Sequence, residues 1–543
     1  MARKTDMQII ELALVLLLVM AIGGALVRWT SIGLPIFLVV VGAAASVIPG
    51  LDHIAVDPEV FLLLFIPPLL FADARVLPRR DLLHVIQPVL LLALGLVVLT
   101  VVVVGYFVHW LVPALPLAVA FTLGAIVTPT DAVATAATTV GLPLPNRVSH
   151  TINAESLLND ATGLVAFKLA VAAAAAAGAV TGGEVFKSFL MLSGGGVAVG
   201  VVVEWLGRRL RESLIRVGAD DPVLQTLLGV LIPYAAYLAA EALHVSGVLA
   251  VVIAGLWAGG KEIKGLSIDG RRHSREVWRM IGYVFNGLVF VLLGLQLRHM
   301  LSAVGDYNPL ALAGLALALW VLLMALRFGW VWASAYIRFH FRWGWAGDDT
   351  GPDWRRLFLT SWAAVRGSVT LATALSVPLL TTAGAALPGR DLVVFLAAST
   401  IILTLAVNGV TLPWFIRRLQ APSYGRSRRE EEAARAELAR AGIAALEPLI
   451  PALDDPGTQA FAAQQIHRYR SKIVLHEGSP QAAAAKAVHI AAAREVRLKA
   501  IAAERECLYR LHAADQINEE TLLVIEEELD ERERQSSVDV LRG

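Results

Sequence analysis

The sequence predicts an all-α membrane protein with about thirteen transmembrane helices and a separate helical segment at its C-terminus. Of its 543 residues, 57% are hydrophobic and 17% are charged, whereas a soluble domain carries about 25% charged residues. The charges are also uneven, because 38 of the 91 charged side chains lie in the last 123 residues. We therefore expect a transmembrane domain over residues 1–419 and a soluble domain over residues 420–543.

Thirteen segments of the first domain are apolar enough to span a membrane, which takes about 20 residues as a helix. We expect the first of these segments to be a span and not a cleaved signal peptide, because it is long and has no clear cleavage site. The thirteen segments are 8–28, 33–49, 59–74, 85–112, 117–140, 151–177, 184–206, 222–243, 245–260, 278–298, 309–337, 357–380 and 391–416.

The basic residues between these segments predict an orientation. If the N-terminus is outside, the inner loops hold 19 Lys and Arg residues and the outer segments hold 5. Cytoplasmic loops of membrane proteins carry such an excess, so we expect the C-terminal domain in the cytoplasm. That domain has no nucleotide-binding glycine loop or metal-ligand cluster, and we expect a regulatory or dimer-supporting role. The net charge of +1 and the single Cys507 argue against nucleic-acid binding and a disulfide scaffold.

Ionisable residues inside apolar spans are costly and therefore mark functional sites. Here they gather in the fifth and sixth segments, with further candidates in the third, eleventh and twelfth. The candidates are Asp73, Thr130 and Asp131 beside Pro129, then Glu155, Ser156, Asn159 and Asp160, and finally Arg327 and Arg366. Lys168, Glu204 and Glu241 also fall in or near spans, and we expect them at helix ends or on a dimer face.

Helical geometry separates the sixth segment into two faces. Ser156 lies three residues before Asn159 and four residues before Asp160. Side chains at these spacings lie on one face of a helix, so these three oxygen-bearing side chains share a face. Glu155 lies about 140° away from Asp160 around the helix and needs another partner. From a helix start near Thr151, Asp160 is about 13 Å deep, close to the middle of a core about 30 Å thick.

The fifth segment is expected to be interrupted at Pro129. Proline has no backbone N–H and clashes with the preceding turn, so it frees carbonyl oxygens beside Thr130 and Asp131. Irregular backbone at membrane depth lines a cavity or is buried in protein. Together with the sixth segment, these oxygens predict a site for a hard monovalent cation.

These residues are similar to the motifs of the monovalent cation/proton antiporters of the sodium/proton exchanger branch, including bacterial NhaP-like proteins. The resemblance covers residues 1–419 and not the C-terminal domain. Its marks are residues 65–73 (FIPPLLFAD), Thr130-Asp131, residues 155–160 (ESLLND), Arg327 and residues 365–368 (VRGS).

The resemblance implies an inverted repeat, in which helices 1–6 are related to helices 8–13 and helices five and twelve are broken and crossed. It also implies a homodimer with a moving, ion-carrying core. The aspartate matching Asp160 carries the cation or the proton, and the residues matching Thr130, Asp131, Ser156 and Asn159 complete or support the site. The glutamate matching Glu155 pairs with the arginine matching Arg327.

One departure from the family pattern affects the fifth helix. The family often has proline after Thr-Asp, whereas Pro129 precedes Thr130 and Asp131 here. We therefore expect the break to be displaced by a few residues, and it stays open whether Asp131 contacts the ion directly. The same question stays open for Asp73, because acidic residues of the third helix align loosely.

The pair Asn159-Asp160 resembles the electroneutral exchangers, in which one carboxylate binds either one cation or one proton. The expected substrates are H⁺ and Na⁺, with K⁺ or Li⁺ as alternatives, and no cofactor is expected. The expected setting is the cell membrane, where such exchange serves pH and cation homeostasis. Two other functions remain as alternatives. One is an organic-anion carrier using Arg327 and Arg366, and the other is an intramembrane aspartyl protease using Asp131 and Asp160, although the Gly-x-Gly-Asp signature of such proteases is missing.

Overall fold

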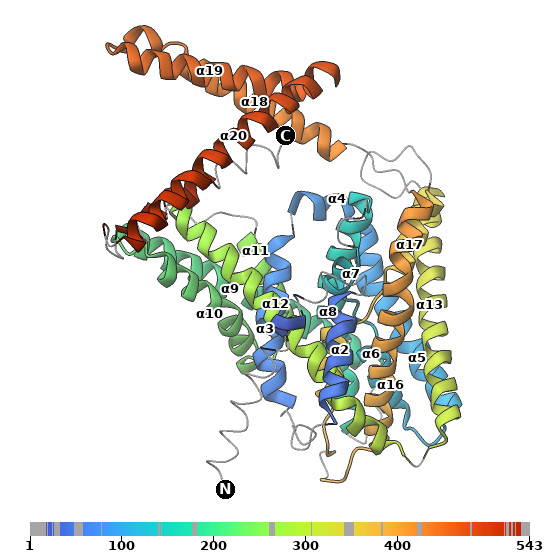
Figure 1. Cartoon of the computed structure of the whole chain (residues 1–543). Coiled ribbons are helices and arrows are strands. Elements are labelled where there is room, and N and C mark those ends of the chain that lie inside the picture. The colour runs from blue at the N-terminus through green and yellow to red at the C-terminus, as the bar shows by residue number, and fades with distance from the viewer. Residues whose placement is uncertain are drawn as a thin grey trace. The chain divides into compact units, whose positions relative to one another are not determined.

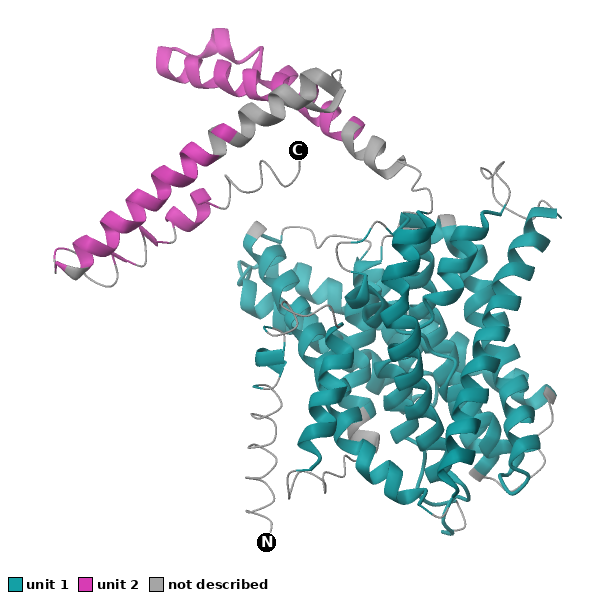
Figure 2. Ribbon diagram, turned by 45° about the vertical axis from the view of Figure 1, so that its right-hand side comes forward, with its two compact units in different colours: residues 1–423 teal, residues 424–543 magenta. Residues whose placement is uncertain are grey.

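The computed structural model of the chain divides into two compact units, residues Met1–Ser423 and Tyr424–Gly543 (Figure 2). Each unit is described by itself. The residues described are 18, 20–23, 25, 33–47, 58–77, 79–139, 142, 144–175, 182–259, 266–305, 307–340, 352–381, 384–420, 426–477, 480–514, 516, 521–522, 525–526 and 528–533.

Every regular element that is described in the first unit is a helix (Figure 1). The elements are α2 (Leu34–Ala45), α3 (Pro58–Val76), α4 (Arg79–Leu90), η1 (Leu91–Leu96), α5 (Val97–Leu111), α6 (Leu117–Ile126), α7 (Ala132–Thr138), α8 (Asn146–Ala175), α9 (Gly182–Arg216), α10 (Pro222–Ala242), α11 (Gly247–Gly259), α12 (Ile268–Ala303), α13 (Pro309–His340), α14 (Trp354–Trp362), α15 (Ser368–Leu375), α16 (Arg390–Leu403), η2 (Thr404–Gly409) and α17 (Val410–Leu419).

The all-helical membrane fold predicted from the sequence is confirmed. Among the described residues, seven helices are long and apolar enough to cross a membrane, and three more apolar helices are shorter. The predicted span 8–28 lies largely outside the described residues. Each of the other twelve predicted segments coincides with one helix or with one interrupted helix, while the total of thirteen stays a prediction.

Several helices are longer than their apolar stretches. α9 has 35 residues and α12 has 36, because the helices continue into polar turns that hydropathy does not detect. α8 likewise begins at Asn146 instead of Thr151. Asp160 is therefore about 21 Å from the start of its helix, not 13 Å.

Two predicted spans are broken near their middle. α6 ends at Ile126 and α7 begins at Ala132, with Pro129 in the five-residue break. α14 ends at Trp362 and α15 begins at Ser368. The interruption of helices five and twelve expected from the family resemblance is confirmed, and the first break includes the Thr-Pro-Thr-Asp sequence itself.

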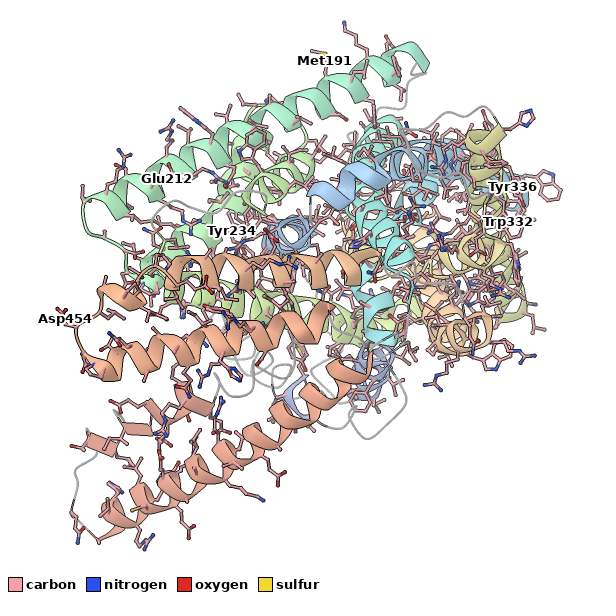
Figure 3. The ribbon with its side chains drawn as sticks, turned by 90° about the horizontal axis from the view of Figure 1, so that it is seen from above. Met191, Glu212, Tyr234, Trp332, Tyr336 and Asp454 are labelled. Carbon is pink, nitrogen blue, oxygen red and sulfur yellow. The ribbon has the colours of Figure 1, made fainter. Side chains whose placement is uncertain are left out.

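The helices of the first unit pack closely where small residues face each other. α2 crosses α12 at Gly42 and Gly294, and a Cβ on Gly42 would lie 2.2 Å from the carbonyl oxygen of Val291. Seen from above, α9, marked by Met191 and Glu212, and α13, marked by Trp332 and Tyr336, lie at opposite edges of the unit (Figure 3). The interrupted helices are more central, and their breaks are buried.

The second unit contains α18 (Arg426–Leu446), the 3₁₀ turn η3 (Ile450–Ala452), α19 (Pro456–Glu477) and α20 (Pro480–Ala513). The helical structure expected for the C-terminal segment is thus present in these elements. Asp455 caps the start of α19, and the hydroxyl and backbone N–H of Thr458 hold the pKa of the Asp455 carboxyl below its usual value. Near the end of the unit, Arg532 binds Glu504 on α20 through two hydrogen bonds.

Candidate functional site

The two broken helices meet at their breaks. The backbone N–H of Asp131 donates to the carbonyl oxygen of Val365 at 2.7 Å. The hydroxyl of Thr135 donates to the carbonyl oxygen of Ala363 at 3.0 Å. These bonds give partners to backbone groups that the interrupted helices leave unpaired inside the membrane.

The Asp131 carboxylate caps the beginnings of two half-helices at once. One oxygen accepts the backbone N–H of Ala134 on α7 at 2.8 Å, and the other accepts the backbone N–H of Ser368 on α15 at 3.1 Å. A negative charge is favourable at a helix N-terminus. The close approach requires Gly367, because a Cβ there would lie 1.8 Å from the second oxygen.

Arg366 lies at the C-terminal ends of the other two half-helices, α6 and α14. Its guanidinium donates to the carbonyl oxygens of Val127, just past α6, and of Ala364, just past α14. A cation is favourable at a helix C-terminus. The crossing therefore has one carboxylate at two helix beginnings and one guanidinium at two helix ends.

Three polar side chains connect α8 to the first break. The hydroxyl of Ser156 donates to the carbonyl oxygen of Thr130 at 2.5 Å and accepts the backbone N–H of Ala132 at 3.1 Å. The amide of Asn159 donates to the hydroxyl of Thr130 at 2.8 Å. Ser156 and Asn159 thus share a face and hold the unwound backbone, as their spacing predicted.

Asp160 has no such partner. Its side chain is buried, and its Oδ1 atom makes no hydrogen bond to any described residue. A buried carboxylate oxygen without a donor is costly, so it points to a ligand that binds oxygen. A small cavity beside Asp160 is lined by Asp73, Pro129, Thr130, Asp131, Ser156 and Ser368, among others.

The lining of this cavity brings together residues from four helices that are distant in sequence. Asp73 comes from α3, is exposed, and lines the cavity together with residues of the two breaks. The cavity therefore offers carboxylate, hydroxyl and carbonyl oxygens, the ligand types that hard cations prefer. No group of three or more His, Cys, Asp or Glu side chains that could hold a metal ion occurs within the described residues.

Glu155 faces away from this cavity and pairs with Arg327. Both Glu155 oxygens accept from the two terminal nitrogens of Arg327, and the two side chains are 1% and 3% exposed. Arg327 also donates to the carbonyl oxygen of Thr360 on α14. The pairing that the family resemblance implied is present, and Glu155 points away from Asp160 as helical geometry predicted.

Two residues that support the second break were missed from the sequence. The hydroxyl of Thr404 accepts the backbone N–H of Arg366 at 3.1 Å. The amide of Asn408 donates to the carbonyl oxygen of Trp362 at 2.9 Å, at the end of α14. Both lie in the π-helical turn η2, and the available signal was that they are the two polar residues of an otherwise apolar turn.

The comparisons with known proteins agree with this geometry. Residues 14–418 match the model of the family described as the transmembrane sodium/hydrogen exchanger. The chain belongs to this family. It is a multi-pass membrane transporter that exchanges a cation for a proton, and not an enzyme, so the intramembrane protease considered above is excluded.

Individual relatives extend the match beyond the transmembrane domain. The Na(+)/H(+) exchanger YjcE of Escherichia coli is 34% identical, over 96% of this chain and 98% of its own length. A Bacillus subtilis protein named as a sodium, potassium, lithium and rubidium/H(+) antiporter is also 34% identical, over 97% of this chain and 78% of its own length. The fold resembles that of the sodium proton antiporter MjNhaP1 from Methanocaldococcus jannaschii, with a TM-score of 0.57 and 19% identity over 77% of this chain and all of that one.

Proposed function

We propose that Asp160 is the single carrier of this exchanger and binds either one monovalent cation or one proton. The observation that supports this most strongly is its buried Oδ1 atom, which has no donor within the described structure. Burial makes an isolated charge costly. The carboxylate is therefore much more stable with a bound cation or a bound proton than with nothing bound. Competition for one carboxylate couples the two substrates without any cofactor.

The neighbours of Asp160 have different roles in this proposal. Thr130 and Ser156 provide hydroxyl and carbonyl oxygens beside the carboxylate, and Asn159 fixes Thr130 through its amide. Asp73 is an exposed carboxylate that lines the cavity, and its charge attracts cations. These residues bind or orient the ion, while the charge that titrates belongs to Asp160.

Asp131 is assigned a positioning role and not a carrier role. Both of its oxygens already accept backbone N–H groups, at the starts of α7 and α15. Protonation of Asp131 would remove charge-assisted bonds from two helix ends, so it is a poor carrier. Arg366 balances the other two helix ends, and Pro129 keeps the first break free of helical structure.

This division of roles supports electroneutral exchange of one cation for one proton. Asn159 contributes a neutral amide, and Asp131 stays charged in both states. The oxygen ligands suit Na⁺, Li⁺ and K⁺ alike, and the name of the Bacillus subtilis relative includes all three. We therefore propose a broad selectivity among monovalent cations, which serves pH and cation homeostasis.

An organic-anion carrier is not favoured, because both arginines that would bind the anion have other partners. Arg327 binds Glu155 and the carbonyl oxygen of Thr360, and Arg366 binds the carbonyl oxygens of Val127 and Ala364. An anion would have to displace these bonds inside the membrane.

The remaining parts of the proposal concern the setting. We place the exchanger in the cell membrane as a homodimer in contact with lipid, with the N-terminus outside and residues 420–543 in the cytoplasm. The excess of basic residues in the predicted inner loops supports this orientation. The transport domain is residues 1–419, and the helices of the C-terminal domain regulate it.

The test is proton flux in proteoliposomes containing purified protein, with Na⁺, K⁺ and Li⁺ presented in turn. Asp160→Asn keeps the shape of the side chain but cannot titrate, so it should abolish cation-driven proton movement. Asp391→Asn is the matched control, because Asp391 is an exposed carboxylate at the start of α16. Flux by Asp160→Asn above half that of the unmodified protein would overturn the assignment of Asp160.

A further inference from the structure

Thr370 is a buried residue of α15 that lines the same cavity as Asp160, and it is 1% exposed. Ser368, at the start of the same half-helix, lines the cavity too, but its backbone N–H and its hydroxyl both contact the Asp131 carboxylate. Among the residues that line the cavity from this half-helix, Thr370 therefore has the hydroxyl that is available to an ion.

The hydroxyl of Thr370 is not bonded to its own helix. A threonine inside a helix commonly donates to the backbone carbonyl oxygen one turn earlier. Thr373, one turn further along α15, does so and donates to Val369 at 2.7 Å. One turn before Thr370 the chain is not yet helical, since α15 begins at Ser368. The Thr370 hydroxyl instead donates across the crossing to the carbonyl oxygen of Pro129, at 3.4 Å.

The bond between Thr370 and Pro129 is long, because hydrogen bonds from a hydroxyl to an oxygen are most often about 2.7–2.8 Å. The Pro129 carbonyl oxygen accepts from no other described residue, and no described residue donates to the Thr370 hydroxyl. Both residues line the cavity. Buried polar groups are normally well bonded. Two buried oxygens with one weak bond between them therefore have unused capacity to bind an ion.

The electrostatics of α15 permit a cation near its first turn. The beginning of a helix has a partial positive charge and by itself repels cations. Here the Asp131 carboxylate accepts the backbone N–H of Ser368 at 3.1 Å and neutralises this end of α15. The Thr370 hydroxyl, which lies in the first turn, can therefore approach a cation without the repulsion that a bare helix beginning causes.

We propose that the Thr370 hydroxyl is a ligand of the transported cation and that the Pro129 carbonyl oxygen binds the ion beside it. This inference rests on the proposal that Asp160 carries the ion. A hydroxyl can rotate so that its proton points away and a lone pair faces the cation. The long bond between Thr370 and Pro129 is then replaced by two contacts between the ion and oxygen, the ligand type that hard cations prefer. One bound ion thereby joins both broken helices.

A ligand of this kind distinguishes the cation from the proton. A proton binds covalently to one oxygen of Asp160, whereas a cation needs several oxygens around it. Loss of the Thr370 hydroxyl should therefore weaken the binding of the cation and not that of the proton. The loss should also be greater for a smaller ion, because charge and oxygen lie closer together and interact more strongly. Thr370 thus contributes to the selectivity among Li⁺, Na⁺ and K⁺.

The test measures initial proton flux in proteoliposomes containing the purified full-length protein, over a range of Li⁺, Na⁺ and K⁺ concentrations and at several pH values. Thr370→Val removes the hydroxyl and keeps a similar shape, Thr370→Ala removes it without that shape, and Thr370→Ser keeps it. Thr373→Val is the matched control. Thr373 lies on the same helix, is 0% exposed, bonds to its own helix and does not line the cavity.

Thr370→Val and Thr370→Ala should raise the KM for Na⁺ about tenfold or more, as expected for loss of one contact to a charge, and should leave the maximal flux within about twofold. The KM for Li⁺ should rise more than that for K⁺. The KM ratio between variant and unmodified protein should be the same at each pH, because Thr370 makes no bond to Asp160. Thr370→Ser and Thr373→Val should stay within about twofold of the unmodified KM, since neither removes a ligand.

The outcomes separate this inference from the assignment of Asp160. An unchanged KM in both variants without the hydroxyl, together with loss of flux in Asp160→Asn, would overturn the role of Thr370 and support that of Asp160. Flux that persists in Asp160→Asn would overturn the carrier assignment itself. If Thr373→Val raises the KM as much as Thr370→Val does, or if Thr370→Ser does not restore it, the effect comes from packing and the role of Thr370 is refuted.

Discussion

The buried pair of Glu155 and Arg327 allows a quantitative prediction about the stability of the transport domain. Arg327 has two kinds of partner, Glu155 and the carbonyl oxygen of Thr360, whereas the Glu155 carboxylate is bonded to Arg327 alone among the described residues. Breaking a buried pair by removing one member costs about 3–5 kcal/mol, because the other charge stays buried without compensation. Arg327→Gln should therefore be more destabilising than Glu155→Gln.

The double variant should be milder than the more damaging single variant. With both charges replaced by neutral amides, no unpaired charge remains, and the two amides can bond to each other. The sum of the single effects is about 6–10 kcal/mol, while the double variant should lose no more than about 3–5 kcal/mol. The coupling energy is then about 3 kcal/mol or more, the upper end of the range for residues in contact.

The assay is the apparent melting temperature of the purified protein in detergent for the four members of this cycle. The ion pair between Lys168 and Glu241 provides a matched control, because its side chains are 34% and 37% exposed. Neutralising that pair should change stability by about 0–1 kcal/mol, since exposed pairs contribute little. If the double variant Glu155→Gln/Arg327→Gln melts at the temperature given by adding the two single shifts, the pair does not contribute as described.

Three further predictions follow from the geometry. Gly367→Ala places a Cβ against Asp131 and should abolish exchange, whereas Gly314→Ala, which meets nothing within 4 Å, should preserve it; equal flux in both variants would show that the close approach at Gly367 is not required. Truncation after Gln420 removes no residue of the site, so exchange should persist with altered regulation; complete loss of flux from a normally folded protein would place the C-terminal domain in the mechanism. If Asp160 alone titrates, each cycle moves no net charge, and a cation jump on a solid-supported membrane should give no sustained current. The membrane potential contributes about 2.3 kcal/mol per charge per 100 mV, and this contribution is zero when no net charge moves. A current that scales with turnover would make Asp131 a second carrier.

The parts of the site that lie on one helix could be predicted from the sequence, because their geometry is local. Ser156, Asn159 and Asp160 share a face of α8, and Glu155 points away from Asp160 toward Arg327. Helical periodicity determines these directions once a helix is assumed. The interruption at Pro129 was likewise predictable, since proline cannot complete the helical bonding pattern.

The parts that depend on distant contacts could not be predicted in the same way. Asp131 caps α15 through Ser368, which is 237 residues later, and no local pattern relates the two. The π-helical turn at residues 91–96 has only apolar residues and glycine and leaves no mark in the sequence, and the turn at residues 404–409 is marked only by Thr404 and Asn408. Lys168, Glu204 and Glu241 were expected at helix ends or on a dimer face, and Glu241 does lie in the last turn of α10. The sequence did not show that Lys168 pairs with Glu241 or that Glu204 pairs with Arg208.

The two broken helices are supported in parallel ways, and the difference between them supports the choice of Asp160 as carrier. The first break is held by the hydroxyl of Ser156 and the amide of Asn159, and the second by the hydroxyl of Thr404 and the amide of Asn408. The residue that follows the amide differs between the two breaks, because Asp160 follows Asn159 whereas Gly409 follows Asn408. The shared groups hold unwound backbone inside the membrane, which both breaks need. The Asp160 carboxylate has no counterpart at the second break. A structural need that both breaks share therefore does not account for it, whereas binding one cation or one proton does.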